Sequence, residues 1–170
     1  MITVYIDMDG VVADFDGYAE KCLGYRNPNG KRYPEEDWYK LVADGRFYLG
    51  LDKLPWADYL ISEICRLATT SKYAFDYKFL TAVPNGNDCP YAFQDKIDWV
   101  RKQWGNIDVF FGPYSQDKAI RCQTNDVLID DRPKNIEDWN NAGGKGIHFI
   151  DDAEGTIQKL KEHLDDFPGV

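Results

Sequence analysis

The sequence is poor in histidine and has no cluster of basic residues. Its two histidines are His148 and His163, and His148 lies in an apolar run that is typical of a strand, so a histidine-based catalytic triad is disfavoured. The longest basic stretch that we single out is Arg101-Lys102, and the net charge is -9. A protein of this charge repels a phosphate polymer at long range, so we expect no nucleic-acid polymer as a partner.

The sequence also lacks a C-x-x-C motif, a long apolar run and a basic N-terminal segment. The absence of C-x-x-C disfavours a thiolate zinc site. We predict that the scattered cysteines are free, buried thiols in a reducing compartment. Without a membrane-length apolar stretch or a signal peptide, we expect a cytoplasmic protein with no membrane partner. The four cysteines are Cys22, Cys65, Cys89 and Cys122.

What the chain does contain is enough apolar material for a core and an acidic pair near its start. Of its 170 residues, 44% are hydrophobic and 15% are aromatic, which predicts one folded domain. Residues 2–6 form a β-branched, aromatic run that is followed by Asp7, Asp9 and Gly10, which predicts a buried strand running into a tight turn. Two carboxylates this close raise the pKa of one of them unless a cation neutralises both. The pair is therefore a candidate for chemistry.

Strand-like and helix-like segments alternate over the rest of the chain. This alternation predicts an α/β domain with a mostly parallel sheet. Phe93, Ile97, Val100 and Trp104 recur at helical spacing, and Gly105 follows as a C-cap. Asn135 is a candidate N-cap for a helix that begins at residue 136. The expected strands are 2–6, 75–81, 107–111, 127–129 and 147–150, and the expected helices are 13–23, 35–43, 56–67, 93–104, 136–142 and 157–164.

Polar residues stand at the carboxyl ends of three expected strands, where ligands bind in such sheets. They are Asp7 and Asp9 after the first, Thr81 at the end of the second, and Asp130 and Asp131 after a later one. Lys118 lies in the loop shortly before the last pair. Carboxylate oxygens at this density suit Mg²⁺, while a hydroxyl and a lysine can bind phosphate oxygens.

The stretch between Val12 and Trp56 is too long for an ordinary connection between a strand and a helix. We interpret it as a cap inserted over the site. The expected organisation is a core domain made of residues 1–14 and 56–170, with a helical cap insertion of residues 15–55.

Four motifs in order resemble those of the haloacid dehalogenase (HAD) superfamily of phosphohydrolases. They are Asp7-x-Asp9-Gly10-Val11, Thr81, Lys118 and the segment 129–133, which reads Ile-Asp-Asp-Arg-Pro. Within the superfamily the chain is most similar to the 5'(3')-deoxyribonucleotidases, through residues 7–15, 89–91, 99–100 and 128–133. The chain departs from that family at motif two, where Ala82 stands in place of a serine. The resemblance implies a HAD-like Rossmannoid fold, a three-layer αβα sandwich with a small helical cap after strand one.

The resemblance also implies a role for each motif residue. Asp7 would be the nucleophile and Asp9 the general acid and base, with Asp7, Asp9 and Asp131 as ligands of Mg²⁺. Asp130 would lie behind them; whether Asp130 or Asp131 binds the metal directly stays open, and we favour Asp131. Phosphate oxygens would be bound by Thr81, the backbone N–H of Ala82 and Lys118. A nucleobase would stack on Phe15, Phe47 or Tyr48, for each of which packing in the core is the alternative.

The expected activity is therefore Mg²⁺-dependent hydrolysis of a small phosphorylated substrate, preferably a deoxynucleoside monophosphate, through an aspartyl-phosphate. The carboxylate at position 9 favours a phosphatase, since the pumps of the superfamily carry threonine there and its dehalogenases lack this second aspartate. The alternatives are a phosphatase for another phosphomonoester, such as a phosphosugar, and a receiver-like signalling or binding domain without turnover. In receivers the acidic pair comes first along the chain, whereas here the adjacent pair comes last. The expected assembly is a monomer or a homodimer.

Overall fold

The computed structural model describes residues 1–27, 32–70 and 72–167. Five parallel strands form one sheet in the order β3-β2-β1-β4-β5. The strands are β1 (Ile2–Ile6), β2 (Phe75–Thr81), β3 (Val109–Phe111), β4 (Val127–Asp130) and β5 (Lys145–His148). The helices are α1 (Phe15–Leu23), α2 (Glu35–Leu41), α3 (Ala57–Ala68), α4 (Ala92–Trp104), α5 (Pro133–Asn141) and α6 (Ala153–Asp165), with 3₁₀ turns η2 (Phe47–Gly50) and η3 (Ser115–Arg121).

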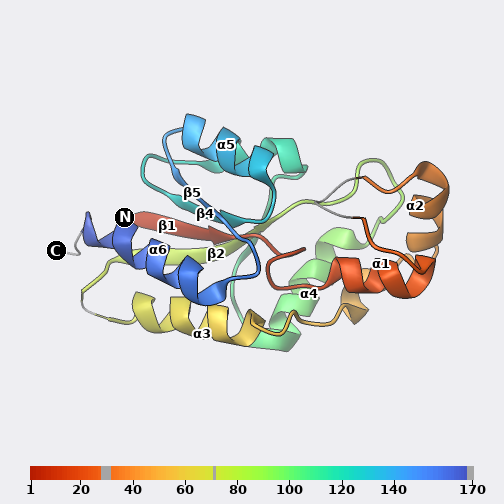
Figure 1. The fold of residues 1–170 in the computed structure, drawn as a ribbon, viewed down its shortest axis with the longest axis horizontal. Coiled ribbons are helices and arrows are strands. Elements are labelled where there is room, and N and C mark those ends of the chain that lie inside the picture. The colour runs from red at the N-terminus through yellow and green to blue at the C-terminus, as the bar shows by residue number, and fades with distance from the viewer. Residues whose placement is uncertain (28–31, 71, 168–170) are drawn as a thin grey trace.

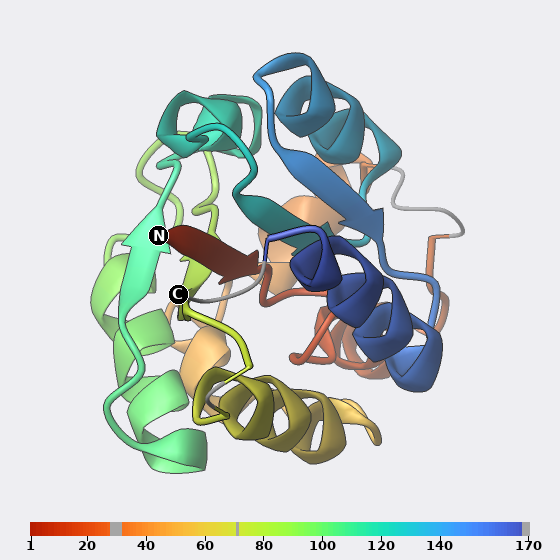
Figure 2. The ribbon, with the colours of Figure 1, turned by 90° about the vertical axis from the view of Figure 1, so that its left-hand side faces the viewer.

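The sheet is the middle layer of three (Figures 1 and 2), as the predicted αβα sandwich requires. Alternate strand residues point to opposite faces, so the two faces have separate cores. Val4, Ile6 and Phe79 pack on one face in the large cluster that includes α3, α4 and α6. Tyr5 and Leu128 pack on the other face against Trp139 of α5. Burial on both faces explains the nearly continuous apolar runs of β1 and β4, whereas β2 carries the half-buried Asp76 and Lys78.

The predicted strands and helices are confirmed, with shifts at some ends. The first helix begins at Phe15 and not at Ala13, because Asp14 caps it by accepting a hydrogen bond from Gly17 N at 2.8 Å. The last strand lies two residues earlier than predicted. Its Gly146 pairs with Leu128 and donates its N–H to Asn140 Oδ1 at 2.7 Å, while Ile150 is exposed. Of the cysteines, Cys89 alone is buried, so the prediction of four buried thiols is wrong.

Helix α4 buries a different face from the one that its apolar spacing predicts. Phe93 is exposed, whereas Asp95 and Lys96 are buried beside Trp99 and Val100. Asp95 binds the guanidinium of Arg46 at 2.6 Å, a contact that ties the segment before η2 to α4. Two charged residues are thus built into the packed face of this helix.

Helices α1 and α2 lie beyond the carboxyl end of β1 (Figure 1). The segment that returns from them packs on the main core, since Phe47, Tyr48 and Leu51 belong to the same cluster as the sheet residues. The Nε1 of Trp99 also donates a hydrogen bond to the carbonyl of Leu51 at 2.8 Å. The division into a core and a cap of residues 15–55 stays a prediction.

The strand order separates this fold from the receiver alternative. Receiver domains have the order 2-1-3-4-5, in which the chain reverses direction across the sheet after the second strand. Here β1 lies between β2 and β4, the order 3-2-1-4-5. No helix in the described part of the chain is long and apolar enough to cross a membrane.

Candidate active site

The carboxylate of Asp7 is buried at the end of β1 and is bound by a lysine. The Nζ of Lys118 lies 2.7 Å from Asp7 Oδ1, and only 3% of the lysine side chain is exposed. Burial by itself lowers the pKa of Lys118, but the carboxylates of Asp7 and Asp130 outweigh it and raise that pKa above its ordinary value. Lys118 is therefore a permanent cation that fixes one oxygen of Asp7 and leaves the other available.

Asp130 holds this lysine in place and is itself held by neighbouring donors. Its Oδ2 accepts hydrogen bonds from Lys118 Nζ at 2.8 Å and from Asn135 Nδ2 at 3.0 Å. Its Oδ1 accepts from the backbone N–H of Arg132 at 2.9 Å. Asn135 lies inside α5, which begins at Pro133, so the prediction that it caps a helix at residue 136 is wrong. Its role is to anchor Asp130.

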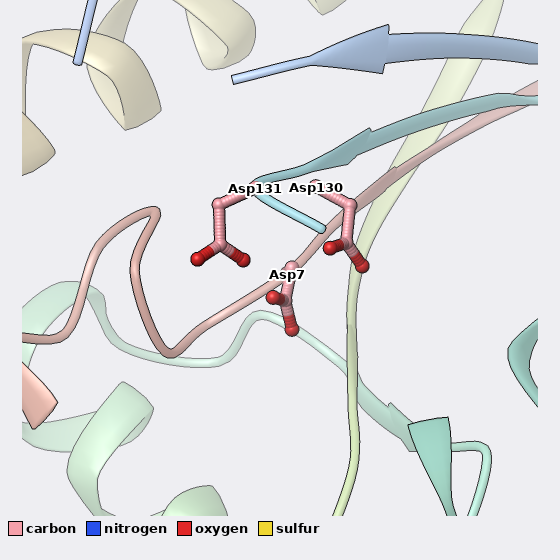
Figure 3. Close-up of side chains that lie close together, drawn as sticks. All are labelled: Asp7, Asp130 and Asp131. Atoms are coloured by element: carbon pink, nitrogen blue, oxygen red, sulfur yellow. The ribbon is translucent and has the colours of Figure 1, made fainter. Parts of the chain in front are cut away.

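Asp131 completes an acidic cluster with Asp7 and Asp130, in which one oxygen from each lies within 4.8 Å of the others. Figure 3 shows the carboxylates of Asp131 and Asp7 close together, just beyond the ends of β4 and β1. Burial, with the charges of Asp7 and Asp130 added, raises the pKa of Asp131 to about 9. The Oδ1 of Asp131 is buried and has no hydrogen-bond partner.

The backbone turn after Asp9 brings a second group of residues to the same edge. The amides of Val11, Val12 and Ala13 all donate to the carbonyl of Met8, at 2.8 to 3.1 Å. Gly10 makes this tight turn with a φ of +84°, a value that glycine adopts without strain. The turn directs the side chain of Asp9 toward β2 and α4.

Lys96 is a site residue that the sequence analysis missed. Its Nζ donates to Asp9 Oδ2 at 2.7 Å and to Thr81 Oγ1 at 2.8 Å, and it lies 4.5 Å from the centre of the Tyr48 ring. The lysine side chain is 1% exposed, whereas that of Asp9 is 32% exposed. Lys96 thus links two predicted motif residues, Asp9 and Thr81, through its buried ammonium group.

The predicted base-stacking residues form one aromatic group beside Asp9. The rings of Phe47 and Tyr48 are buried, with centroids 4.1 Å apart, and Phe47 also stacks on Tyr18 at 4.8 Å. Phe15 is partly exposed and packs against Phe47 at 5.9 Å. Phe15 is therefore the most exposed of the three, and Phe47 packs between it and Tyr48.

The residues at this edge fit a divalent cation. When all four carboxylates of Asp7, Asp9, Asp130 and Asp131 are ionised, their charge exceeds that of the two ammonium groups, Lys96 and Lys118, by two. Asp9 Oδ1 and Asp131 Oδ1 are buried oxygens without partners. A buried carboxylate oxygen left unpaired is unfavourable, and a hard cation with oxygen ligands removes that penalty.

Comparison with known proteins gives a curated relative and solved structures of similar fold. The chain is 28% identical over 152 residues to the human mitochondrial 5'(3')-deoxyribonucleotidase. This match covers 78% of the chain but spans only 63% of that relative. No family profile matches the sequence.

The fold comparison agrees with the resemblance stated from the four motifs. A haloacid dehalogenase-like family hydrolase from Xanthomonas campestris aligns with 98% of this chain and 93% of its own, with a TM-score of 0.56 and 13% identity. A phosphonoacetaldehyde hydrolase-like protein from Oleispira antarctica aligns with a TM-score of 0.43 and 13% identity, covering 97% of this chain and 84% of its own, which is too distant to support an argument. The HAD-like fold is confirmed.

Proposed function

We propose that this chain is a phosphatase that hydrolyses small phosphomonoesters with the help of Mg²⁺, and that deoxynucleoside monophosphates are its preferred substrates. The observation that carries the proposal is the contact between Lys118 and Asp7 beside Asp131. It leaves a buried carboxylate with one fixed and one free oxygen at the edge where a ligand binds in this type of sheet.

The free oxygen of Asp7 is the proposed nucleophile. It forms a bond to phosphorus while the bond from phosphorus to the leaving-group oxygen breaks, which gives an aspartyl-phosphate. Asp9 donates a proton to the departing oxygen and then accepts one from the water that attacks phosphorus in the second step. This returns Asp7 to its carboxylate form and releases inorganic phosphate.

Neighbouring groups bind the phosphate through these steps. Thr81 Oγ1 and the backbone N–H of Ala82 are the proposed donors to its oxygens, and Lys118 balances negative charge on both phosphate and Asp7. Mg²⁺ held by Asp7, Asp131 and the carbonyl of Asp9 would supply charge neutralisation between the carboxylate and the incoming phosphate. We assign direct ligation to Asp131, because Asp130 is already occupied by Lys118, Asn135 and an N–H.

The nucleotide as substrate is the finer part of the proposal. It is supported by the 28% identity to a deoxyribonucleotidase and by an aromatic group next to Asp9. We propose that the base stacks on Phe15, with Phe47 and Tyr48 beneath it. A phosphosugar is the rival substrate, since it uses the same reaction without the aromatic contact.

The test is release of inorganic phosphate from a panel of deoxynucleotides, ribonucleotides and sugar phosphates, each assayed with Mg²⁺ and with EDTA. We expect the highest kcat/KM for a deoxynucleoside monophosphate and no turnover with EDTA. A preference for sugar phosphates would refute the nucleotide proposal and keep the phosphatase. No release from any ester would refute both.

The variant Phe15→Ala separates the two substrate classes within one protein. If the base stacks on this ring, the variant loses about 5- to 150-fold in kcat/KM for nucleotides, the equivalent of roughly 1–3 kcal/mol of stacking. Activity on a sugar phosphate serves as the internal control and should change much less. Equal losses for both substrates would mean that Phe15 only supports the fold.

A further inference from the structure

We propose that Lys96 is a positioning residue for catalysis, which aims the carboxylate of Asp9 and the hydroxyl of Thr81 at the phosphate. The proposal rests on the phosphatase function proposed above. It assigns a role to a second buried lysine that has no contact with Asp7 among the hydrogen bonds and ion pairs of the described residues.

The first step of the argument is the number of hydrogens on the ammonium group. A lysine ammonium has three N–H donors and no acceptor. Two of them are accounted for by Asp9 Oδ2 at 2.7 Å and Thr81 Oγ1 at 2.8 Å. The third faces the ring of Tyr48, whose centre is 4.5 Å away, a cation–π distance. All three donors of Lys96 are used inside the protein, so Lys96 does not bind substrate itself.

The second step concerns Thr81. Because Lys96 can only donate, Thr81 Oγ1 must accept from it, and its own hydroxyl hydrogen is left to donate elsewhere. Its one intramolecular acceptor among the described residues is the carbonyl of Ala82, at 3.5 Å, a distance at which a hydrogen bond is weak. Lys96 therefore leaves the hydroxyl of Thr81 free to donate a hydrogen bond, which is what a phosphate oxygen requires.

The third step concerns Asp9. One of its oxygens, Oδ2, is fixed by Lys96, while the other, Oδ1, has no hydrogen-bond partner within the described part of the chain. A general acid has to lie within hydrogen-bond reach of the leaving-group oxygen. Displacement of such a group by about 1 Å lowers the rate by roughly 10²-fold. Lys96 restricts the movement of the Asp9 carboxylate, because the lysine side chain is itself buried, with 1% of it exposed.

The experiment compares Lys96→Met with Lys78→Met on two esters, p-nitrophenyl phosphate and an alkyl phosphate. Lys78 is a matched control because its Nζ also contacts a carboxylate, Asp76 at 3.1 Å, and an aromatic ring, Phe110 at 4.8 Å, but not the site. The kcat/KM value reports the steps up to departure of the alcohol. An alkyl oxygen needs a proton from Asp9 to leave, whereas p-nitrophenolate leaves without one.

We expect Lys96→Met to lower kcat/KM by about 10²-fold for the alkyl ester and by much less for the aryl ester. Any loss of Thr81 alignment should raise KM for both esters alike, and Lys78→Met should leave both unchanged. Equal losses of kcat/KM for both esters in Lys96→Met would overturn the positioning of the general acid, because a general loss of folded protein has no dependence on the leaving group.

A second measurement decides the proposal without turnover. In a crystal structure of Lys96→Met we expect the carboxylate of Asp9 to move from its place beside Thr81, with the backbone of residues 7–11 unchanged. Side chains of Asp9 and Thr81 that keep their positions would overturn the proposal. If the wild-type chain hydrolyses none of the esters, the phosphatase function fails, and this structure still decides whether Lys96 positions the two groups.

Discussion

Gly10 and Asp131 approach each other so closely that no side chain fits between them. A Cβ atom added to Gly10 would lie 2.1 Å from Asp131 Oδ2 and 2.7 Å from its Cγ. Gly10 also has a φ of +84°, in the region that other residues enter only with strain. The glycine after the acidic pair is therefore required twice, once for the turn and once to let β4 bring its carboxylate to Asp7.

We expect Gly10→Ala to lose activity by at least about 10²-fold, because the methyl group must push Asp131 away from the site and such displacements have effects of this size. The left-handed backbone adds roughly 1–2 kcal/mol of instability. Phosphate release and thermal unfolding measure the two effects separately. Full activity in this variant would mean that Asp131 can move without consequence.

Two other glycines provide matched controls for this substitution. Gly24 shares the positive φ, at +81°, but has nothing within 4 Å of its added Cβ. Gly45 has neither the positive φ nor a close neighbour. Gly24→Ala should lower stability and keep activity, and Gly45→Ala should change neither.

The raised pKa of Asp131 predicts that the metal-free protein becomes less stable as the pH rises. Its pKa is raised from 3.8 to about 9 by burial and by Asp7 and Asp130. The folded state therefore binds one more proton than the unfolded state between these values, and the free energy of unfolding falls from about pH 4 to about pH 9. Denaturant unfolding in EDTA at pH 6 and at pH 8 measures this fall, and Asp131→Asn should reduce it.

Added Mg²⁺ should oppose this fall, because metal ligation requires the deprotonated carboxylate and binding to the folded state adds stability. We expect a larger stabilisation by Mg²⁺ at pH 8 than at pH 6 in the wild-type protein and little in Asp131→Asn. Equal stabilisation of both proteins would show that the ion binds elsewhere.

The parts of the site that could be predicted from the sequence are those that follow apolar strands. Asp7, Thr81 and Asp130 each lie at or directly after the buried carboxyl-terminal residues of a strand, so the apolar residues before them predict their position at one edge. These residues converge because the strands before them run parallel in one sheet. The predicted strand at 75–81 agrees with the bounds of β2. Here burial in the sheet is the cause of both the local apolar pattern and the position of these residues.

Lys96 could not be found this way, because a lysine inside a helix is ordinarily exposed. The apolar spacing of Phe93 and Ile97 predicts the buried face of α4, but the true face carries Ala92, Lys96 and Trp99. A signal was present, since positions 92, 96, 99 and 100 also have helical spacing once a charged residue is allowed in the stripe. What makes that burial possible is the carboxylate of Asp9 and the hydroxyl of Thr81, which are distant in sequence.

The ion pair between Lys118 and Asp130 predicts that a substitution at Asp130 partly restores the stability that is lost by a substitution at Lys118. Lys118→Met leaves Asp7 and Asp130 without their shared cation, and removal of one partner from a buried ion pair lowers stability by about 3–5 kcal/mol. Adding Asp130→Asn removes one of the two unpaired charges, so the double variant should be more stable than Lys118→Met alone. Denaturant unfolding measures this coupling, and stability losses that simply add would refute it.

The two aspartates of the first motif should fail in different ways if they have different roles. Asp7→Asn removes the oxygen that bonds to phosphorus, so we expect no turnover and no incorporation of phosphate from a labelled substrate. Asp9→Asn keeps Asp7 as the nucleophile but loses proton transfer, worth about 10²–10⁴-fold, and should let labelled phosphate accumulate on Asp7 when the leaving group is p-nitrophenolate. Mass spectrometry of the rapidly quenched protein detects that adduct. Its appearance in Asp7→Asn would assign the nucleophile to another residue, whereas its accumulation in Asp9→Asn would tie the second step, hydrolysis by water, to the carboxylate that Lys96 holds.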